Sequence, residues 1–398
     1  MAKYIEDEYD EERPRRKSGS GSGSRNGSGR RPAGRSGSGR GGSGKKSSRK
    51  QQAKKQRRRI IFFVAELVVL VVAVFVLYGV MSGTKSGKMV LDNDEIIIND
   101  KVVQAQETTM KGYRNIALFG VDSTTGALTK STRSDTIMIA SINQDTGECK
   151  LVSVYRDTYL NLSNDSYNKC NAAYAKGGPE MAISMLNMNL DMNITDFVTV
   201  GFAGLTDTID ALGGVYIDVD DSEISHLNNY QLCIAEDLKR TYTPVSSTGY
   251  QLLDGLQATG YCRIRYTAGD DFKRAERQRE VLAAVADQAK KASLPKLTET
   301  ANAVFNETYT SLDLTEIIEM LGNVGSYYIS DTAGFPQESN RTTGTIGSKG
   351  SCVIPLNLED NVKWLHQFLF NDYEYEPSAT VKECSEKIYS DTNGYLKK

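Results

Sequence analysis

The chain has 398 residues and a formal net charge of −2, so one large domain with extensions is expected. Only two histidines are present, His226 and His366, and no other catalytic signal accompanies either one, which disfavours Ser-His-Asp and Cys-His catalysis. The charge is unevenly placed: the first 59 residues hold 19 of the 48 Lys and Arg but 6 of the 50 Asp and Glu, leaving an acidic remainder.

Residues 1–59 are predicted to form a disordered, basic cytoplasmic tail. Gly, Ser, Arg and Lys dominate residues 18–50, and such a composition buries too little apolar surface to offset chain entropy. Its charge would attract anionic membrane lipid. Nucleic-acid binding is the alternative, but no nucleic-acid partner is expected because this basic segment lacks interleaved aromatic residues that stack on bases.

Residues 60–82, "IIFFVAELVVLVVAVFVLYGVMS", are apolar apart from Glu66 and a few weakly polar residues. A bilayer-spanning helix needs roughly 20 such residues, and the run is too long for a signal-peptide core. A buried globular helix is the alternative, although such helices are rarely apolar on every face. The preceding "KKQRRR" predicts a single-pass protein of the cell membrane, with the N-terminus cytoplasmic and the main domain extracytoplasmic.

Alternating strand and helix patterns follow a polar extracellular spacer, residues 83–112. They predict an α/β fold, a three-layer α-β-α sandwich behind the transmembrane helix. A catalytic domain is expected over residues 113–292, and a helical continuation with a polar tail over residues 293–398. Strands are expected at 115–122, 134–142, 149–157, 196–202 and 215–221, and helices at 179–190 and 203–214.

Charged residues gather at the ends of three of these strands. Asp122 ends the first strand, Arg133 and Asp135 bracket the start of the second, and Arg156 and Asp157 end the third. Ligands of α/β sheets bind beyond strand ends, where loops bring distant residues together. We therefore expect these side chains to share one site.

Two further basic clusters follow. "CRIRY", residues 262–266, is predicted as a strand with Arg263 and Arg265 on one face. In the helix predicted to follow, Arg274, Arg277 and Gln278 share one side. A solvated helix is the alternative; Lys273, Glu276 and Arg279 fit that reading, and Arg277 fits either.

Arginine is suited to bidentate phosphate binding, so several arginines in an acidic body indicate a pyrophosphate ligand. Asp122 and Asp135 would repel that ligand unless a divalent cation lay between, and Mg²⁺ commonly binds one or two carboxylates plus phosphate oxygens. No Walker-type phosphate loop and no Cys-x-x-Cys pair occur. Outside the cytoplasm the six cysteines could pair, and Cys352 with Cys384 is the expected pair.

Six ordered motifs between residues 113 and 292 resemble the LytR-CpsA-Psr family of bacterial cell-wall enzymes: "GVDS…TRSDTIMIASIN", "VSVYRDTYLNL", "YNKCNAAYAKGG", "DALGGVYIDV", "LLDGLQATGYCRIRY" and "GDDFKRAERQREVL". The resemblance implies a phosphotransferase that moves a glycopolymer, such as teichoic acid or capsule, from an undecaprenyl-pyrophosphate carrier to peptidoglycan, with Mg²⁺, or alternatively Mn²⁺. Two departures are Tyr155, where the family usually has proline, and Cys170, where an aliphatic residue is common.

The resemblance also implies residue roles. Its catalytic set is Asp122, Asp135, Arg133 and Asp157, of which the first two would hold the metal. Asp157 is either a base or an orienting group. The set expected to bind the pyrophosphate is Arg156, Lys169, Arg263, Arg265, Asp271, Arg274 and Gln278.

Apolar runs at 181–190 and 197–205 would line the lipid channel or simply pack in the core. Beyond residue 293 helices are expected, including one at 360–370, and "GTIGSKGSCVIP" is expected to be a hairpin or extended segment. Two other functions stay open. One is an envelope-linked transcriptional attenuator, and the other is a non-catalytic protein that binds wall polymer or lipid carrier.

Overall fold

The computed structural model describes residues 87–91, 95–122, 128–129 and 132–392. The basic tail and the expected transmembrane segment, residues 1–82, lie outside the described residues. Within the part that is described, no helix is both long enough and apolar enough to cross a membrane. Residues 83–398 cluster as one compact unit.

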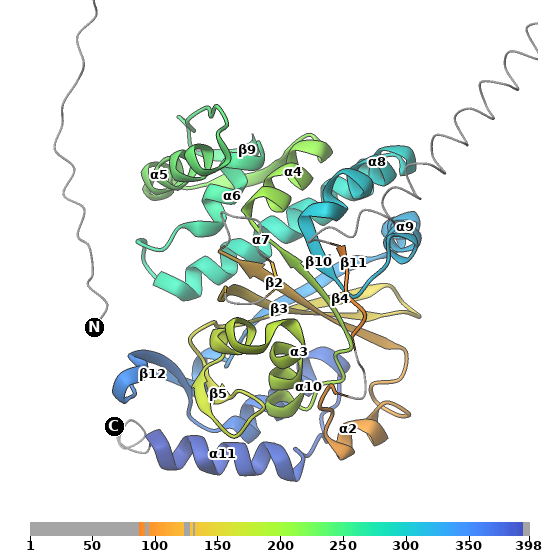
Figure 1. Ribbon diagram of the computed structural model, residues 1–398, viewed down its shortest axis with the longest axis vertical. Helices are drawn as coiled ribbons and strands as arrows, with labels where there is room; N and C mark the ends of the chain where they lie inside the picture. Colours follow the sequence, from red (N-terminus) through yellow and green to blue (C-terminus); the bar gives the residue numbers. More distant parts are fainter. Residues whose placement is uncertain (1–86, 92–94, 123–127, 130–131, 393–398) are drawn as a thin grey trace, which may run out of the picture. The chain divides into compact units, whose positions relative to one another are not determined.

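A seven-stranded mixed sheet forms the centre of this unit (Figure 1). Its middle strands are antiparallel neighbours, whereas β7 runs parallel to β2 and β11 runs parallel to β4. The expected α/β class is confirmed. Across the sheet the strands are β1 (Gly87–Lys88), β10 (Thr308–Thr310), β7 (Asp196–Val200), β2 (Tyr113–Val121), β3 (Ser134–Asn143), β4 (Glu148–Val154) and β11 (Tyr328–Phe335).

Helices cover both faces of the sheet, because successive strand residues point to opposite sides and both sets are apolar. On one face Ile137 and Ile139 pack in the same cluster as Ile183 of α3 (Asn171–Leu190). On the other, Ala140 packs near Leu282 of α7 (Asp270–Lys291). Figure 1 shows α3, α10 (Leu358–Phe370) and α11 (Ala379–Thr392) below the sheet, with α7, α4 (Phe202–Leu212), α5 (Asp221–Leu238), α6 (Gly255–Arg263) and α8 (Leu294–Val304) above it.

The strand expected at 262–266 is wrong: helix α6 continues to Arg263, and Arg265 lies in the loop that follows. Asp254 starts the helix with a capping box, in which its side chain accepts from the Gln257 amide and the Gln257 side chain accepts from the Asp254 amide. The Arg-Ile-Arg alternation is typical of a strand, but the capping box at Asp254 starts a helix that extends through Arg263. A two-stranded antiparallel sheet precedes α6; its strands, β8 (Val215–Val219) and β9 (Gly249–Leu253), are separated in the chain by α5.

The fold uses more of the chain than residues 113–292. Val102 of α2 (Asp100–Ala105) and Met110, both in the expected spacer, are buried in the main core. Beyond residue 292 the chain adds β10 and β11 to the central sheet. Helix α9 (Leu314–Gly322) and the helix expected at 360–370, which is α10, are present, and the expected hairpin is β12 (Arg341–Thr345) with β13 (Ser351–Pro355).

The predicted disulfide between Cys352 and Cys384 is wrong, since all six cysteines are free. Cys352 and Cys384 are both buried in the main core. The Asn161 side-chain amide donates to Cys384 Sγ, and Cys352 Sγ donates to the Gly350 carbonyl. Burial raises the pKa of both thiols, which favours their protonated form.

Candidate active site

The sheet brings the predicted strand-end residues to one edge. β3 starts beside the end of β2, with Ser134 opposite Val121, and it runs antiparallel to β4. The end of β2, the start of β3 and the end of β4 are therefore neighbours, and Asp122, Asp135 and Arg156 lie at this end of the strands. The loop after α6 and the first turn of α7 bring Arg265 and Asp271 to this edge.

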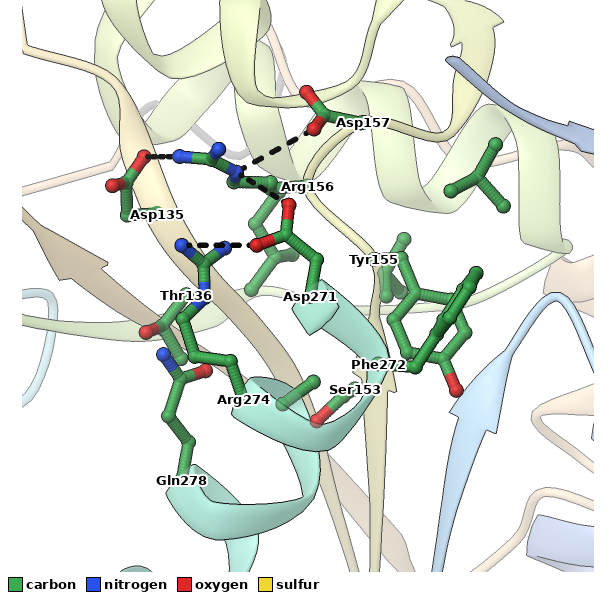
Figure 2. A pocket seen from close by; sticks show the side chains of 14 residues that line it. Asp135, Thr136, Ser153, Tyr155, Arg156, Asp157, Asp271, Phe272, Arg274 and Gln278 are labelled. Atoms are coloured by element: carbon green, nitrogen blue, oxygen red, sulfur yellow. Dashed lines mark hydrogen bonds and ion pairs between the residues drawn. The ribbon is translucent and has the colours of Figure 1, made fainter. Parts of the chain in front are cut away.

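Two carboxylates hold the arginines in place (Figure 2). Asp135 accepts from Arg156 Nη1 at 2.8 Å and from Arg265 Nη2 at 3.2 Å, using a different oxygen for each. Asp271 lies 3.4 Å from Arg156 Nε, 3.4 Å from Arg274 Nη1 and 3.8 Å from Arg265 Nε. These contacts fix three guanidinium groups around one point.

Asp157 and Lys169 form the outer end of this network. Lys169, the last residue of β6 (Tyr167–Lys169), which pairs with β5 (Tyr159–Asn161), places Nζ 3.1 Å from Asp157 Oδ1. The other Asp157 oxygen lies 3.6 Å from Arg156 Nε. Both carboxylate oxygens are thus turned toward cations, an arrangement that suits an orienting group.

Arg274 is the most deeply buried arginine of the network, with a side-chain exposure of 5%. Its Nε has no hydrogen-bond partner among the residues that the structure describes. Burial, together with the nearby charge of Arg156, lowers the pKa of Arg274 to about 10. A buried donor without an acceptor is costly, and an anion bound beside Arg274 would supply an acceptor.

The charged network borders an apolar cavity of about 370 Å³. Gln278, one helical turn beyond Arg274, also lines it. The charged and amide members of the lining are Asp122, Asp135, Arg263, Arg265, Arg274 and Gln278, and hydroxyl groups come from Thr136, Thr208, Thr259 and Tyr230. The apolar walls come from the sheet, α4 and α7, and include Leu118, Phe119, Val121, Met138, Val198, Val200, Phe202, Leu205, Val281, Leu282 and Val285. A smaller space of about 20 Å³ lies beside it and shares Asp135, Arg274 and Gln278 (Figure 2).

The two apolar runs singled out in the sequence have different places. The run at 197–205 supplies Val198, Val200, Phe202 and Leu205 to the cavity wall. The run at 181–190 lies in α3, and its Ile183 and Leu186 are buried in the core on the opposite face of the sheet. Only the first run is in a position to meet a ligand in this cavity.

Arg263 and Arg133 are placed differently from the network arginines. The Arg263 guanidinium lies 4.3 Å from the ring centre of Phe202 and 5.4 Å from that of Tyr230, so aromatic faces rather than carboxylates hold it at the cavity wall. Arg133 is exposed and does not line either cavity. Asp122 is exposed as well, but it lines the larger cavity.

The other charged residues of α7 discussed above are either buried in the protein or located at its surface. Arg277, which the sequence left undecided, is 1% exposed and donates to Glu223 Oε1 at 2.7 Å, the Ile264 carbonyl at 3.2 Å and Thr267 Oγ1 at 2.7 Å. It therefore braces the loop that carries Arg265. Lys273 and Glu276 reach the surface and pair with each other at 3.0 Å. The expectation that Arg279 is solvated is wrong: it is 8% exposed, and burial lowers its pKa.

Sequence patterns missed several residues near the site. Thr136, Ser153, Tyr155 and Phe272 line the small space, and Arg341 packs against two of them. Tyr155 and Phe272 adjoin predicted site residues in sequence, which is the only local signal for them. Nothing local marks Arg341, because it lies far along the chain from every motif.

Comparison with known proteins adds a family match. The model of the LytR_cpsA_psr family matches residues 74–345. The polyisoprenyl-teichoic acid–peptidoglycan teichoic acid transferase TagU of Oceanobacillus iheyensis is 30% identical over 217 residues, 52% of this chain and 62% of the relative. Biofilm regulatory protein A of Streptococcus mutans is 27% identical over 306 residues, 68% of this chain and 72% of the relative.

A third relative also has a solved structure. The teichoic acid transferase TagV of Bacillus subtilis is 29% identical over 270 residues, 66% of this chain and 60% of the relative. Its crystal structure has a TM-score of 0.52 at 25% identity, covering 67% of this chain and 99% of that chain. The matches to TagU and TagV span 62% and 60% of those relatives' own lengths.

Proposed function

The chain belongs to the LytR_cpsA_psr family, and from this premise we propose that it is a membrane-anchored, extracytoplasmic cell-wall glycopolymer transferase. Its donor would be a glycopolymer on an undecaprenyl-pyrophosphate carrier, and its acceptor a sugar hydroxyl of peptidoglycan. Teichoic acid is the polymer named for TagU and TagV. For this chain the polymer is proposed only as a class, which includes teichoic acid and capsule.

One observation carries the proposal: an arginine cluster borders an apolar cavity of about 370 Å³. A polyprenyl pyrophosphate has the same two parts, a doubly charged head and a long hydrocarbon tail. The head would meet Arg265 and Arg274, while the tail would lie against residues such as Val198 and Leu282. A free sugar phosphate would leave the apolar wall without a purpose.

The network supports transfer at phosphorus. Attack by a hydroxyl on a phosphoryl group requires positioning and stabilisation of charge on the phosphate oxygens. Arg156 and Arg265 would bind those oxygens while Asp135 keeps their planes fixed. Arg274 would supply a buried donor that lacks a partner in the free protein. Gln278 would add a neutral amide on the cavity side.

The donor set fits a divalent cation only in combination with phosphate. Asp122 and Asp135 line the same cavity, but both Asp135 oxygens already accept from arginines. Among the residues described, no group of three His, Cys, Asp or Glu is placed to hold a metal ion. Mg²⁺ tolerates such a site, since it commonly takes one or two carboxylates plus phosphate oxygens. When bound, Mg²⁺ or Mn²⁺ would neutralise charge on the pyrophosphate.

Two contacts bear on the role of Asp157. Its carboxylate faces Lys169 at 3.1 Å and Arg156 at 3.6 Å. A general base needs an oxygen free to receive a proton from the acceptor hydroxyl. We therefore propose that Asp157 orients Arg156 and keeps Lys169 near the phosphates.

A regulatory function is the second candidate, favoured by the name of the Streptococcus mutans relative. As an attenuator the chain would need its basic tail to bind DNA. Deleting residues 1–50 would abolish such binding and leave transfer intact. A non-catalytic binder of wall polymer is the third candidate, but it has no need for the metal that Asp122 and Asp135 are proposed to hold.

The proposal is tested with the full-length protein in detergent, a polyprenyl-pyrophosphate-linked glycopolymer, Mg²⁺ and peptidoglycan. The expected result is covalent attachment of the polymer to peptidoglycan. Tight binding of the donor with no attachment would instead support the non-catalytic reading.

A further inference from the structure

Three distant segments meet beside the small space of the site. Tyr155 directly precedes Arg156, Phe272 directly follows Asp271, and Arg341 begins β12. The rings of Tyr155 and Phe272 meet edge to face, with centres 4.7 Å apart and planes at 86° (Figure 2). The Arg341 guanidinium lies 4.0 Å from the Phe272 ring centre and 4.9 Å from that of Tyr155.

Hydrogen bonds fix the Arg341 side chain in this position. Its Nη1 donates to Tyr155 Oη at 3.2 Å and to the Pro336 carbonyl at 3.0 Å. None of the ion pairs found among the described residues involves Arg341. The Arg341 cation is therefore stabilised by two aromatic faces and two neutral oxygens. This stabilisation requires the side chain to stay in the position that contacts all four groups.

The opposite side of Tyr155 is closed by the main chain of β11. A Cβ atom on Gly334 would collide with Oη and Cζ of Tyr155. The Tyr155 amide also donates to the Phe335 carbonyl at 3.0 Å. Tyr155 is thus held between β11, Phe272 and Arg341, with little room to turn.

We propose that Arg341 is a positioning residue for the pyrophosphate site. By clamping Tyr155 and Phe272 together, it sets the separation of the residues next to them, Arg156 and Asp271, whose side chains lie 3.4 Å apart. Arg341 lines neither cavity, whereas Tyr155 and Phe272 both line the small one. It acts through these neighbours, and the inference rests on the proposed transferase function.

The test compares the full-length wild type with Arg341→Gln in the transfer assay. Misplacing a binding group by about 1 Å can cost about 100-fold, so we expect kcat to fall roughly 10- to 100-fold while the donor KM changes by less than about 3-fold. Arg341→Lys, which keeps the cation, should recover part of the loss. In an Arg156→Lys background, Arg341→Gln should cause little further loss, because the two residues act as one unit.

Arg114→Gln is the matched control. Arg114 is also a half-buried arginine, paired with Asp196 at 2.9 Å, but it lies at the far end of β2 from Asp122. This control should lower the Tm without lowering kcat. If Arg341→Gln fails to fold, Tyr155→Phe removes only the hydroxyl that accepts from Arg341, and a smaller kcat loss is expected.

Two negative results are distinguishable. If the wild type transfers polymer and Arg341→Gln matches its kcat, the positioning role is wrong and the transferase function stands. An Arg341→Gln loss that is additive with Arg156→Lys overturns the inference in the same way. If the wild type itself transfers nothing, the proposed function fails, and the positioning role fails with it.

Discussion

Arg277 donates to Glu223 across 2.7 Å, with the two side chains only 2% and 4% exposed. Three residues earlier on the same helix, Arg274 is also buried, with 5% of its side chain exposed, but its Nε has no partner among the described residues. All three nitrogens of the Arg277 guanidinium donate within the protein, whereas Arg274 pairs with Asp271 through Nη1 and keeps an Nε donor that a ligand would have to satisfy. This difference separates the structural role of Arg277 from the ligand-binding role proposed for Arg274, which lines both cavities. Arg279 also has nitrogens without partners among the described residues, but it lines neither cavity.

Replacing Arg277 with Met should destabilise the protein strongly, because it leaves Glu223 buried without its partner. Breaking a buried ion pair in this way costs about 3–5 kcal/mol in the free energy of unfolding. Urea denaturation of the wild type and the variant measures it. Lys273→Ala removes a surface pair from the same helix and should cost less than about 1 kcal/mol. Equal effects of the two substitutions would contradict a structural role for Arg277.

Replacing Arg274 with Met should stabilise the free protein and weaken donor binding. Burial and repulsion by Arg156 outweigh the attraction of Asp271 and lower the pKa of Arg274, and its Nε lacks an acceptor among the described residues. Removal of the guanidinium should therefore raise the Tm of the ligand-free protein. Donor binding should weaken at least about 10-fold, the loss of one charge-assisted hydrogen bond. Thermal unfolding and donor titration report the two effects. A lower Tm would show that Arg274 holds the fold instead.

Acid should destabilise the protein through His366. Burial lowers the pKa of His366 from 6.5 to about 4, so the unfolded chain binds a proton more readily than the folded one between these values. Stability is therefore full above about pH 6.5 and falls as the pH drops toward about 4, by about 3 kcal/mol from this group. In His366→Gln this part of the pH dependence should vanish. An unchanged slope in the variant would place the acid sensitivity elsewhere.

The cysteines provide a check on the fold. Cys233 is exposed, whereas the other five are buried and free. A maleimide should label one thiol in the native protein and six after denaturation without reductant. Labelling of only four thiols under the second condition would restore the Cys352 to Cys384 disulfide.

Sequence patterns located the strand-end residues of the site, because strand positions and their flanking charges are local features. Asp135 and Arg156 meet as expected from strands that end at one edge. The roles of these residues in catalysis stay predictions. The apolar cavity was predicted only in part, since an apolar run such as 181–190 has the same pattern whether it lines a cavity or fills a core.

Other features depended on contacts that no local pattern records. Arg279 looks like a solvated residue in sequence, but the neighbours of α7 bury it. Arg341 reaches Tyr155 from 186 residues away. In "CRIRY" a two-residue alternation resembled a strand, and the capping box at Asp254, eight residues before Cys262, carried the stronger helical signal.

The most direct test of the account measures polymer transfer by the full-length wild type and by Asp135→Asn, with Mg²⁺ and after chelation. The amide in the variant lacks the charge that holds Arg156 and Arg265 and that would attract the metal. We predict Mg²⁺-dependent transfer by the wild type and a loss of about 10²- to 10³-fold in Asp135→Asn, the scale for removing one element of preorganised charge stabilisation. Transfer at the wild-type rate by Asp135→Asn, or no transfer by either protein, would contradict the account.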